Sequence, residues 1–69
     1  MRLSARNQLS GSVASVDIGA VMATVVIRLE GGQEVVAAIT KDSPESLALA
    51  EGDAVTAVIK ATEVMVGKE

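Results

Sequence analysis

The stretch from Val21 to Thr40 limits the fold of this chain most strongly. Between Val21 and Glu30 an apolar set of side chains alternates with a more polar set, as in a strand with one buried face. Gly31-Gly32 follows and predicts a two-residue hairpin turn. Gln33 to Thr40 is then the returning strand. Its nearly continuous apolar character predicts that both faces are covered, one of them by a neighbouring subunit.

The segment before this hairpin also has a strand pattern, with one break. From Gln8 to Ile18 the apolar residues change parity midway, and a β-bulge near Ala14-Ser15 would reconcile the two halves. Asp17 to Ala20 then predicts a turn in which Gly19 takes a positive φ. The first strand is therefore expected to bend.

The rest of the chain predicts one short helix and two more strands. Lys41 to Leu49 is the one helical candidate, with Ser43 as N-cap and Pro44 at the first helical position. Asp53 to Lys60 and Thr62 to Val66 predict the last two strands. Five strands with a helix between the third and fourth predict an all-β, OB-like Greek-key barrel, with residues 1–69 as a single domain.

The composition excludes several classes of function. The 69 residues include no Cys, no His and no aromatic residue. Disulfides, thiolate metal sites and Ser-His-Asp or Cys-His catalysis cannot be built, so we expect neither an enzyme nor a site for a metal cation. The net charge of −3 and the missing stacking platforms disfavour nucleic-acid binding.

The small side chains of the apolar residues point to self-association. A chain this short buries only about 60% of the surface that its unfolded form exposes, and its core must be built without aromatics. We therefore expect a homo-oligomer. No apolar run approaches the roughly 18 residues of a membrane span, and no secretory signal is recognisable. A soluble cytoplasmic protein is the expectation.

Three segments offer hydrogen-bond donors. Ser4-Ala5-Arg6-Asn7 contains no carboxylate, Lys60 ends a predicted strand next to the small Ala61, and Thr40 and Ser43 flank the predicted helix start. A fully ionised tetrahedral oxyanion presents only acceptors, so its site needs amides, hydroxyls and cations and excludes carboxylates. Simpler interpretations stay open. In these interpretations Ser43 is a helix cap and not a ligand-binding residue, Lys60 is a solvated surface charge, and Arg6 pairs with a surface carboxylate.

A family resemblance supports the oxyanion hypothesis. The segments that carry it are Ser4–Gly11, Gly31-Gly32, Ile39–Ser43, Leu47–Gly52 and Val58–Gly67. In this order they resemble the molbindins, small molybdate-binding proteins built from one domain of the TOBE superfamily. The resemblance implies an OB-like barrel that assembles as a homohexamer, a trimer of dimers, and binds molybdate or tungstate between subunits.

Carried over position by position, the resemblance also implies the ligand-binding residues. One subunit would contribute Ser4, Ala5, Arg6, Lys60 and Ala61, and another would contribute Thr40 and Ser43. A secondary molybdate site near the three-fold axis would use the backbone of Gly19, Ala20 and Val21. No catalytic cofactor is implied.

The function expected from these features is intracellular storage or buffering of molybdate. The alternative is a regulatory or assembly module, in which the anion changes the recruitment of a protein partner.

Overall fold

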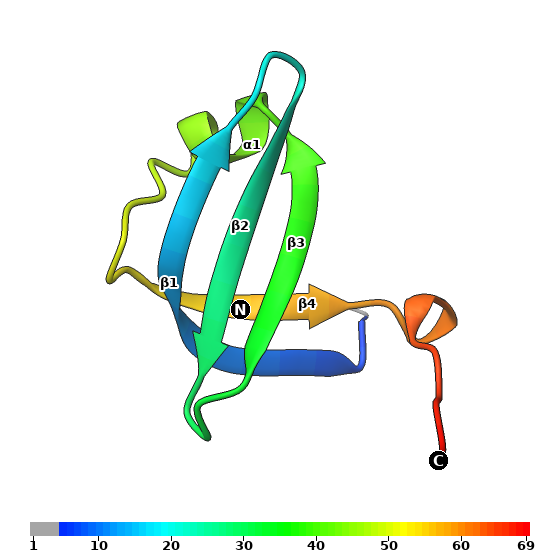
Figure 1. Ribbon diagram of the computed structural model, residues 1–69. Helices are drawn as coiled ribbons and strands as arrows, with labels where there is room; N and C mark the ends of the chain where they lie inside the picture. Colours follow the sequence, from blue (N-terminus) through cyan, green and yellow to red (C-terminus); the bar gives the residue numbers. More distant parts are fainter. Residues whose placement is uncertain (1–4) are drawn as a thin grey trace.

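The computed structural model describes residues 5–69 and shows a strongly curled antiparallel sheet (Figure 1). The elements follow in the order β1 (Asn7–Ile18), β2 (Met22–Leu29), β3 (Glu34–Thr40), α1 (Asp42–Ser46), β4 (Ala54–Ile59) and the 3₁₀ helix η1 (Ala61–Glu63). The strands pair in the spatial order β3-β2-β1-β4. The predicted all-β architecture, with one short helix between the third and fourth strands, is confirmed.

Strand β1 pairs with two different strands, one through each of its halves. Its first half, from Asn7 to Ser12, pairs with β4, and its second half, from Gly11 to Ile18, pairs with β2. The register with β2 shifts between Val13 and Ser15, so the predicted bulge is confirmed. Figure 1 shows the strand bending between the two halves, which carries β4 across the base of the β1–β2–β3 layer.

The predicted fifth strand is wrong for the chain taken alone. Within residues 5–69, Thr62 to Val66 pairs with no strand. The 3₁₀ turn η1 begins directly after β4 and turns the chain away from the sheet (Figure 1). Met65 and Val66 are 93% and 94% exposed. The β-branched Thr62, Val64 and Val66 favour a strand in this segment, but pairing also requires a sheet edge that the segment reaches.

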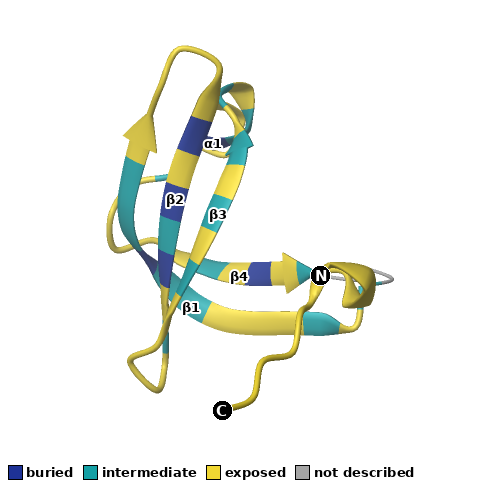
Figure 2. Ribbon diagram, turned by 45° about the vertical axis from the view of Figure 1, so that its right-hand side comes forward, coloured by how far each residue is buried: buried dark blue, intermediate teal, exposed yellow. Residues whose placement is uncertain are grey.

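The core lies inside the curl and comes from the predicted apolar sets. Its most buried residues are Val13, Ala23, Val25, Ile27 and Ala57. The odd-numbered residues of β2 face inward, as expected (Figure 2). Val21 does not, because β2 begins only at Met22 and Val21 lies in the preceding loop, 73% exposed. The opposite face of β3 is not covered within the chain, and Val36 there is 66% exposed.

The two turns that flank β2 differ from the predictions. The β2–β3 loop has three residues, because the Leu29 amide donates to the Gln33 carbonyl and the Gly32 amide to the Leu29 carbonyl. Gly32 takes a φ of +90°, the left-handed conformation that commonly closes a three-residue hairpin loop. Gly19 does not take the predicted positive φ. It lies close to its neighbour instead, and an added Cβ would sit 2.9 Å from the Met22 carbonyl oxygen.

Helix α1 starts earlier than predicted. Lys41 occupies the N-cap position, so Ser43 is the second helical residue and caps nothing with its side chain. Pro44 lies in the first turn, where its missing amide has no partner to lose. At the other end, the Leu49 amide donates to the Pro44 carbonyl and the Ala48 amide to the Glu45 carbonyl. This is a Schellman termination with Ala48 at a φ of +52°.

The loop after α1 is fastened to β1 at the bulge. The amide of Gly52, which has a φ of +89°, donates to the Val13 carbonyl, and the Val13 amide donates to Asp53. These two bonds start the β4 strand in register with β1. No helix within residues 5–69 is long and apolar enough to cross a membrane.

Candidate functional site

The register between β1 and β4 brings two of the predicted donor segments together. The last residue pair is Asn7 with Ile59. Arg6 and Lys60 are the next residues beyond this pair on the two strands, with Ala5 and Ala61 one position further, so the ladder brings the two segments to the same end of the sheet. Segments more than fifty positions apart in the sequence thus share one end of the sheet. Ser4, the remaining predicted member of this half of the site, lies outside the described residues.

Two cations lie at this end of the sheet, and no described carboxylate is paired with either of them. The side chains of Arg6 and Lys60 are exposed. Among residues 5–69 the one ion pair is formed by Arg28 and Glu34 at 2.9 Å, on another part of the sheet. The interpretation in which Arg6 pairs with a surface carboxylate therefore finds no support within the described chain. Two like charges beside each other favour an anion between them.

The backbone next to Lys60 is also suited to an anion. The turn η1 begins at Ala61, and the Glu63 amide donates to the Lys60 carbonyl at 2.9 Å. The first amides of such a turn have no partner inside it and point toward its N-terminal side. Ala61 adds only a methyl group, so a ligand can approach its amide closely. Glu63 is the nearest carboxylate along the chain, two residues further on.

Gln8 contributes a contact that the sequence did not suggest. Its side-chain amide nitrogen Nε2 donates to the carbonyl oxygen of Ala5 at 2.9 Å. The residue therefore reaches back from the second position of β1 to the peptide that precedes Arg6. The strand pattern gave Gln8 no role beyond the start of β1, because hydrogen bonds from a side chain to an irregular backbone segment leave no periodic signal.

Thr40 and Ser43 form a second pair at a different place. Their hydroxyl oxygens lie 3.2 Å apart, with Thr40 exposed and Ser43 half-buried. Figures 1 and 2 both show the end of β3 and α1 far from the end of β4. The structure thus brings Arg6 and Lys60 to the same end of the sheet and Thr40 into contact with Ser43, but it does not bring the two pairs together within one chain.

The loop predicted as a secondary site lies near the second pair. Val21 accepts a hydrogen bond from the Lys41 amide at 2.9 Å, which holds the loop beside the start of α1. The Gly19 amide already donates to the Met22 carbonyl at 2.9 Å. Of the three predicted backbone donors, Gly19 is therefore engaged inside the chain. The contribution of this loop to an anion site rests on Ala20 and Val21.

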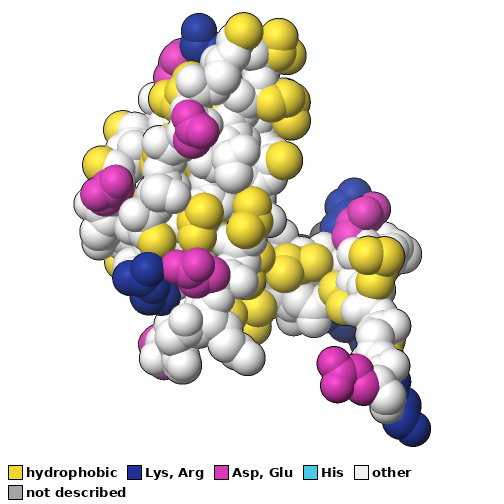
Figure 3. All heavy atoms as spheres, viewed as in Figure 1, with side chains coloured by type: hydrophobic (Ala, Val, Ile, Leu, Met, Phe, Trp, Pro, Cys, Tyr) yellow, Lys and Arg dark blue, Asp and Glu magenta, His cyan; other side chains and the backbone are white. Residues whose placement is uncertain are grey.

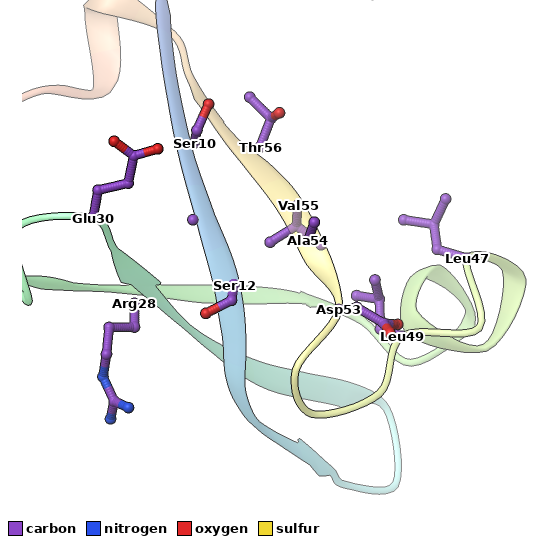
Figure 4. A pocket seen from close by; sticks show the side chains of 11 residues that line it. Ser10, Ser12, Arg28, Glu30, Leu47, Leu49, Asp53, Ala54, Val55 and Thr56 are labelled. Atoms are coloured by element: carbon purple, nitrogen blue, oxygen red, sulfur yellow. The ribbon is translucent and has the colours of Figure 1, made fainter.

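A separate groove on the surface has a different chemical character (Figure 4). It measures about 920 Å³ and is lined by Ser10, Gly11, Ser12, Arg28, Glu30, Leu47, Leu49, Asp53, Ala54, Val55 and Thr56. Two of these residues are carboxylates, and Arg28 is paired with Glu34. A donor-only site for a fully ionised oxyanion does not fit this groove.

Comparison with known proteins places the chain in a family. The TOBE domain family matches residues 3–66. Molybdenum-pterin-binding protein 3 of Clostridium pasteurianum is 50% identical over 66 residues, which cover 96% of this chain and 97% of that protein.

Two solved structures are also similar. A molybdate-binding protein from Sporomusa ovata superposes with a TM-score of 0.91 at 48% identity, covering 99% of this chain and all of the other. The cytoplasmic molybdate-binding protein ModG, in its form with molybdate bound, gives a TM-score of 0.83 at 46% identity, covering 88% of this chain and 43% of ModG. The names of these relatives describe binding and none describes a reaction. The chain therefore belongs to the TOBE domain family and, within it, to the small molbindins that its sequence resembles.

Proposed function

We propose that this protein binds molybdate reversibly, without chemical change, in pockets between copies of the chain. The observation that supports the proposal is the β1–β4 register, which brings the segments that carry Arg6 and Lys60 to one end of the sheet, with no described carboxylate paired to either cation. A dianion between two cations gains charge-assisted hydrogen bonds from both side chains. The other proposed contributors to this half of the pocket are the Ser4 hydroxyl and the backbone amides of Ala5 and Ala61.

The other half of the pocket is supplied by a second copy. Thr40 and Ser43 lie at the opposite end of the sheet, so they join the Arg6–Lys60 pair only across a subunit contact. The exposed apolar side chains support such contacts. Figure 3 shows them along the outer side of β3, and the exposed set includes Met22, Val36, Val64, Met65 and Val66. The assembly proposed is a homohexamer, a trimer of dimers.

Further features of the proposal follow from the same chemistry. Tungstate, which has the same shape and charge as molybdate, is a second ligand. The loop formed by Gly19, Ala20 and Val21 forms a secondary molybdate site through the amides of its last two residues. Residues 1–69 act as one domain, and the protein stores or buffers molybdate in the cytoplasm. The similar protein ModG is a cytoplasmic molybdate-binding protein, which supports this location.

Calorimetric titration with four anions tests the proposal. Molybdate and tungstate are expected to bind saturably, with a stoichiometry set by the oligomer. Phosphate is expected to bind poorly because it carries a proton near neutral pH, and a donor-only pocket offers this proton no acceptor. Sulfate is expected to bind poorly because it is smaller. Equal weak heats for all four anions would refute the proposed function.

A further inference from the structure

The hydrogen bond from Gln8 to Ala5 controls the orientation of one peptide group in the candidate site. A trans peptide is planar, and its carbonyl and its amide N–H point in opposite directions. The carbonyl that Gln8 holds belongs to the same peptide as the Arg6 amide. Any force that fixes the Ala5 oxygen therefore also fixes the direction of the Arg6 N–H.

The hydrogen bond joins a side chain of the paired strand β1 to a peptide group that lies outside the sheet ladder. The backbone of Gln8 is paired with Val58 in the sheet, so its side chain extends from an ordered strand. Ala5 precedes the strand, and the residue pairs between β1 and β4 begin only at Asn7. The sheet ladder thus does not hold the Ala5–Arg6 peptide, and Gln8 is the described side chain that does.

The two orientations of this peptide differ in what they offer an anion. In one, the Arg6 N–H donates toward the ligand. In the other, the Ala5 carbonyl presents a lone pair to it, which repels a fully ionised oxyanion but accepts a hydrogen from a protonated one.

We propose that Gln8 is a positioning residue for the oxyanion site, and that it favours fully ionised oxyanions over protonated ones by holding the Ala5 carbonyl away from the ligand. This inference rests on the proposed function, because it requires that an anion is bound beside Arg6 and Lys60. It goes further in naming a residue outside the ligand-contacting set and in assigning the rejection of protonated anions to one peptide orientation.

The test is a comparison of two matched Gln→Met variants. Gln8→Met keeps the length and flexibility of the side chain and removes its donor. Gln33→Met makes the same change in the β2–β3 loop, where the residue is exposed and distant from the site. Calorimetric titration is carried out on the full chain with molybdate and with phosphate.

The expected result is a selective loss. Gln8→Met binds molybdate about five- to tenfold more weakly, the effect of one lost hydrogen bond. Its affinity for phosphate falls by a smaller factor or rises, so the ratio of molybdate affinity to phosphate affinity decreases. Gln33→Met has the same two affinities as the wild type. Unchanged affinity and unchanged selectivity in Gln8→Met would overturn the inference while wild-type binding upholds the proposed function. Absence of molybdate binding by the wild type would instead overturn the proposed function.

A second measurement separates positioning from a general loss of stability. Molybdate is added to ¹⁵N-labelled protein at a temperature at which every variant is folded, and the Arg6 amide signal is followed by NMR. Molybdate shifts this signal in the wild type and in Gln33→Met, and shifts it far less in Gln8→Met. An equal shift in all three proteins contradicts the inference.

A double substitution identifies which group of Arg6 is positioned. Arg6→Ala removes the guanidinium but retains the backbone amide. If Gln8 acts through the peptide, Gln8→Met weakens molybdate binding by the same factor in the wild type and in Arg6→Ala. No further loss in the Arg6→Ala background would show that Gln8 acts on the guanidinium instead, and the peptide mechanism would be wrong.

Discussion

Arg6 and Lys60 are exposed in the single chain, and their charges are the main chemical resource of the candidate site. An exposed cation binds an anion weakly in water, because solvent screens the attraction. The same cation contributes more when a second copy of the chain covers the ligand and excludes water. In the proposed assembly, the contribution of each cation to anion binding therefore depends on the contact between subunits, whereas the register of β1 with β4 brings both cations to one end of the sheet.

Removal of either cation is expected to weaken molybdate binding at least ~10-fold, which corresponds to about 1.5 kcal/mol for one charge-assisted hydrogen bond. The variants are Arg6→Ala and Lys60→Ala, and titration calorimetry measures the affinity. Lys68→Ala removes an equally exposed charge near the end of the chain and is expected to change little. Wild-type affinity in both site variants would exclude this position as the binding site.

Ala48 is expected to limit stability, because it ends α1 at a φ of +52° in a position that normally favours glycine. A left-handed conformation costs a residue with a Cβ about 1 kcal/mol. Ala48→Gly removes this cost and should raise the thermal midpoint, measured at fixed protein concentration. Ala50→Gly is the control, since Ala50 has no positive φ, and it should lower the midpoint or leave it unchanged. A lower midpoint in Ala48→Gly would contradict the assignment of strain.

At the scale of the elements, the bend of β1 is what builds the Arg6–Lys60 pair. A straight strand could not pair with β2 through one half and cross to β4 through the other. Gly11 lies where the two ladders overlap, paired with both Leu29 and Val55. A Cβ at Gly11 would lie 2.5 Å from the carbonyl oxygen of Arg28, so the close approach of β1 and β2 requires the absence of a side chain.

Gly11→Ala is therefore expected to destabilise the protein by about 1–3 kcal/mol, because backbone atoms on both strands must shift. Urea unfolding at fixed protein concentration measures the free energy. Gly31→Ala is the matched control, since an added Cβ there meets nothing within 4 Å and the residue does not need a positive φ. It should be neutral or slightly stabilising. Equal stability of the two variants would show that β1 and β2 tolerate a wider separation.

At the scale of the whole molecule, two features of the single chain bear on the proposed assembly. Its two donor pairs lie at opposite ends of the sheet, and apolar side chains remain exposed on the outer side of β3 and along the C-terminal segment (Figures 2 and 3). Burial of apolar surface between copies would supply the free energy for assembly. One assembly event would then cover these side chains and unite the two donor pairs.

Val36→Asp tests this link, because it places a charge on the exposed outer side of β3. Native mass spectrometry should detect a hexamer for the wild type and smaller species for the variant, and molybdate binding should be lost with the hexamer. Gln33→Asp adds the same charge in the adjacent loop and should retain both. A monomeric variant with wild-type affinity would show that each chain carries a complete site.

Much of the local structure could be predicted from the sequence. The alternation after Val21 identifies the buried side of β2, and the parity break after Val13 identifies the bulge, since both depend on which side of a strand each side chain faces. The conformations of the turns could not be predicted in the same way. A Gly-Gly pair is compatible with several loops, and the three-residue form is set by the register of Arg28 with Glu34.

The sequence by itself determined the first four strand-forming segments, the donor-rich segments and the absence of His and Cys, because these are properties of side chains and their local spacing. Only the tertiary structure decided that Arg6 and Lys60 lie at the same end of the sheet, that Thr40 lies apart from them, and that Thr62 to Val66 leaves the sheet. Pairing between distant segments depends on which edges the folded chain leaves free and where each turn directs the backbone. The periodicity of side chains along the sequence reveals neither the free sheet edges nor the direction of the backbone after each turn.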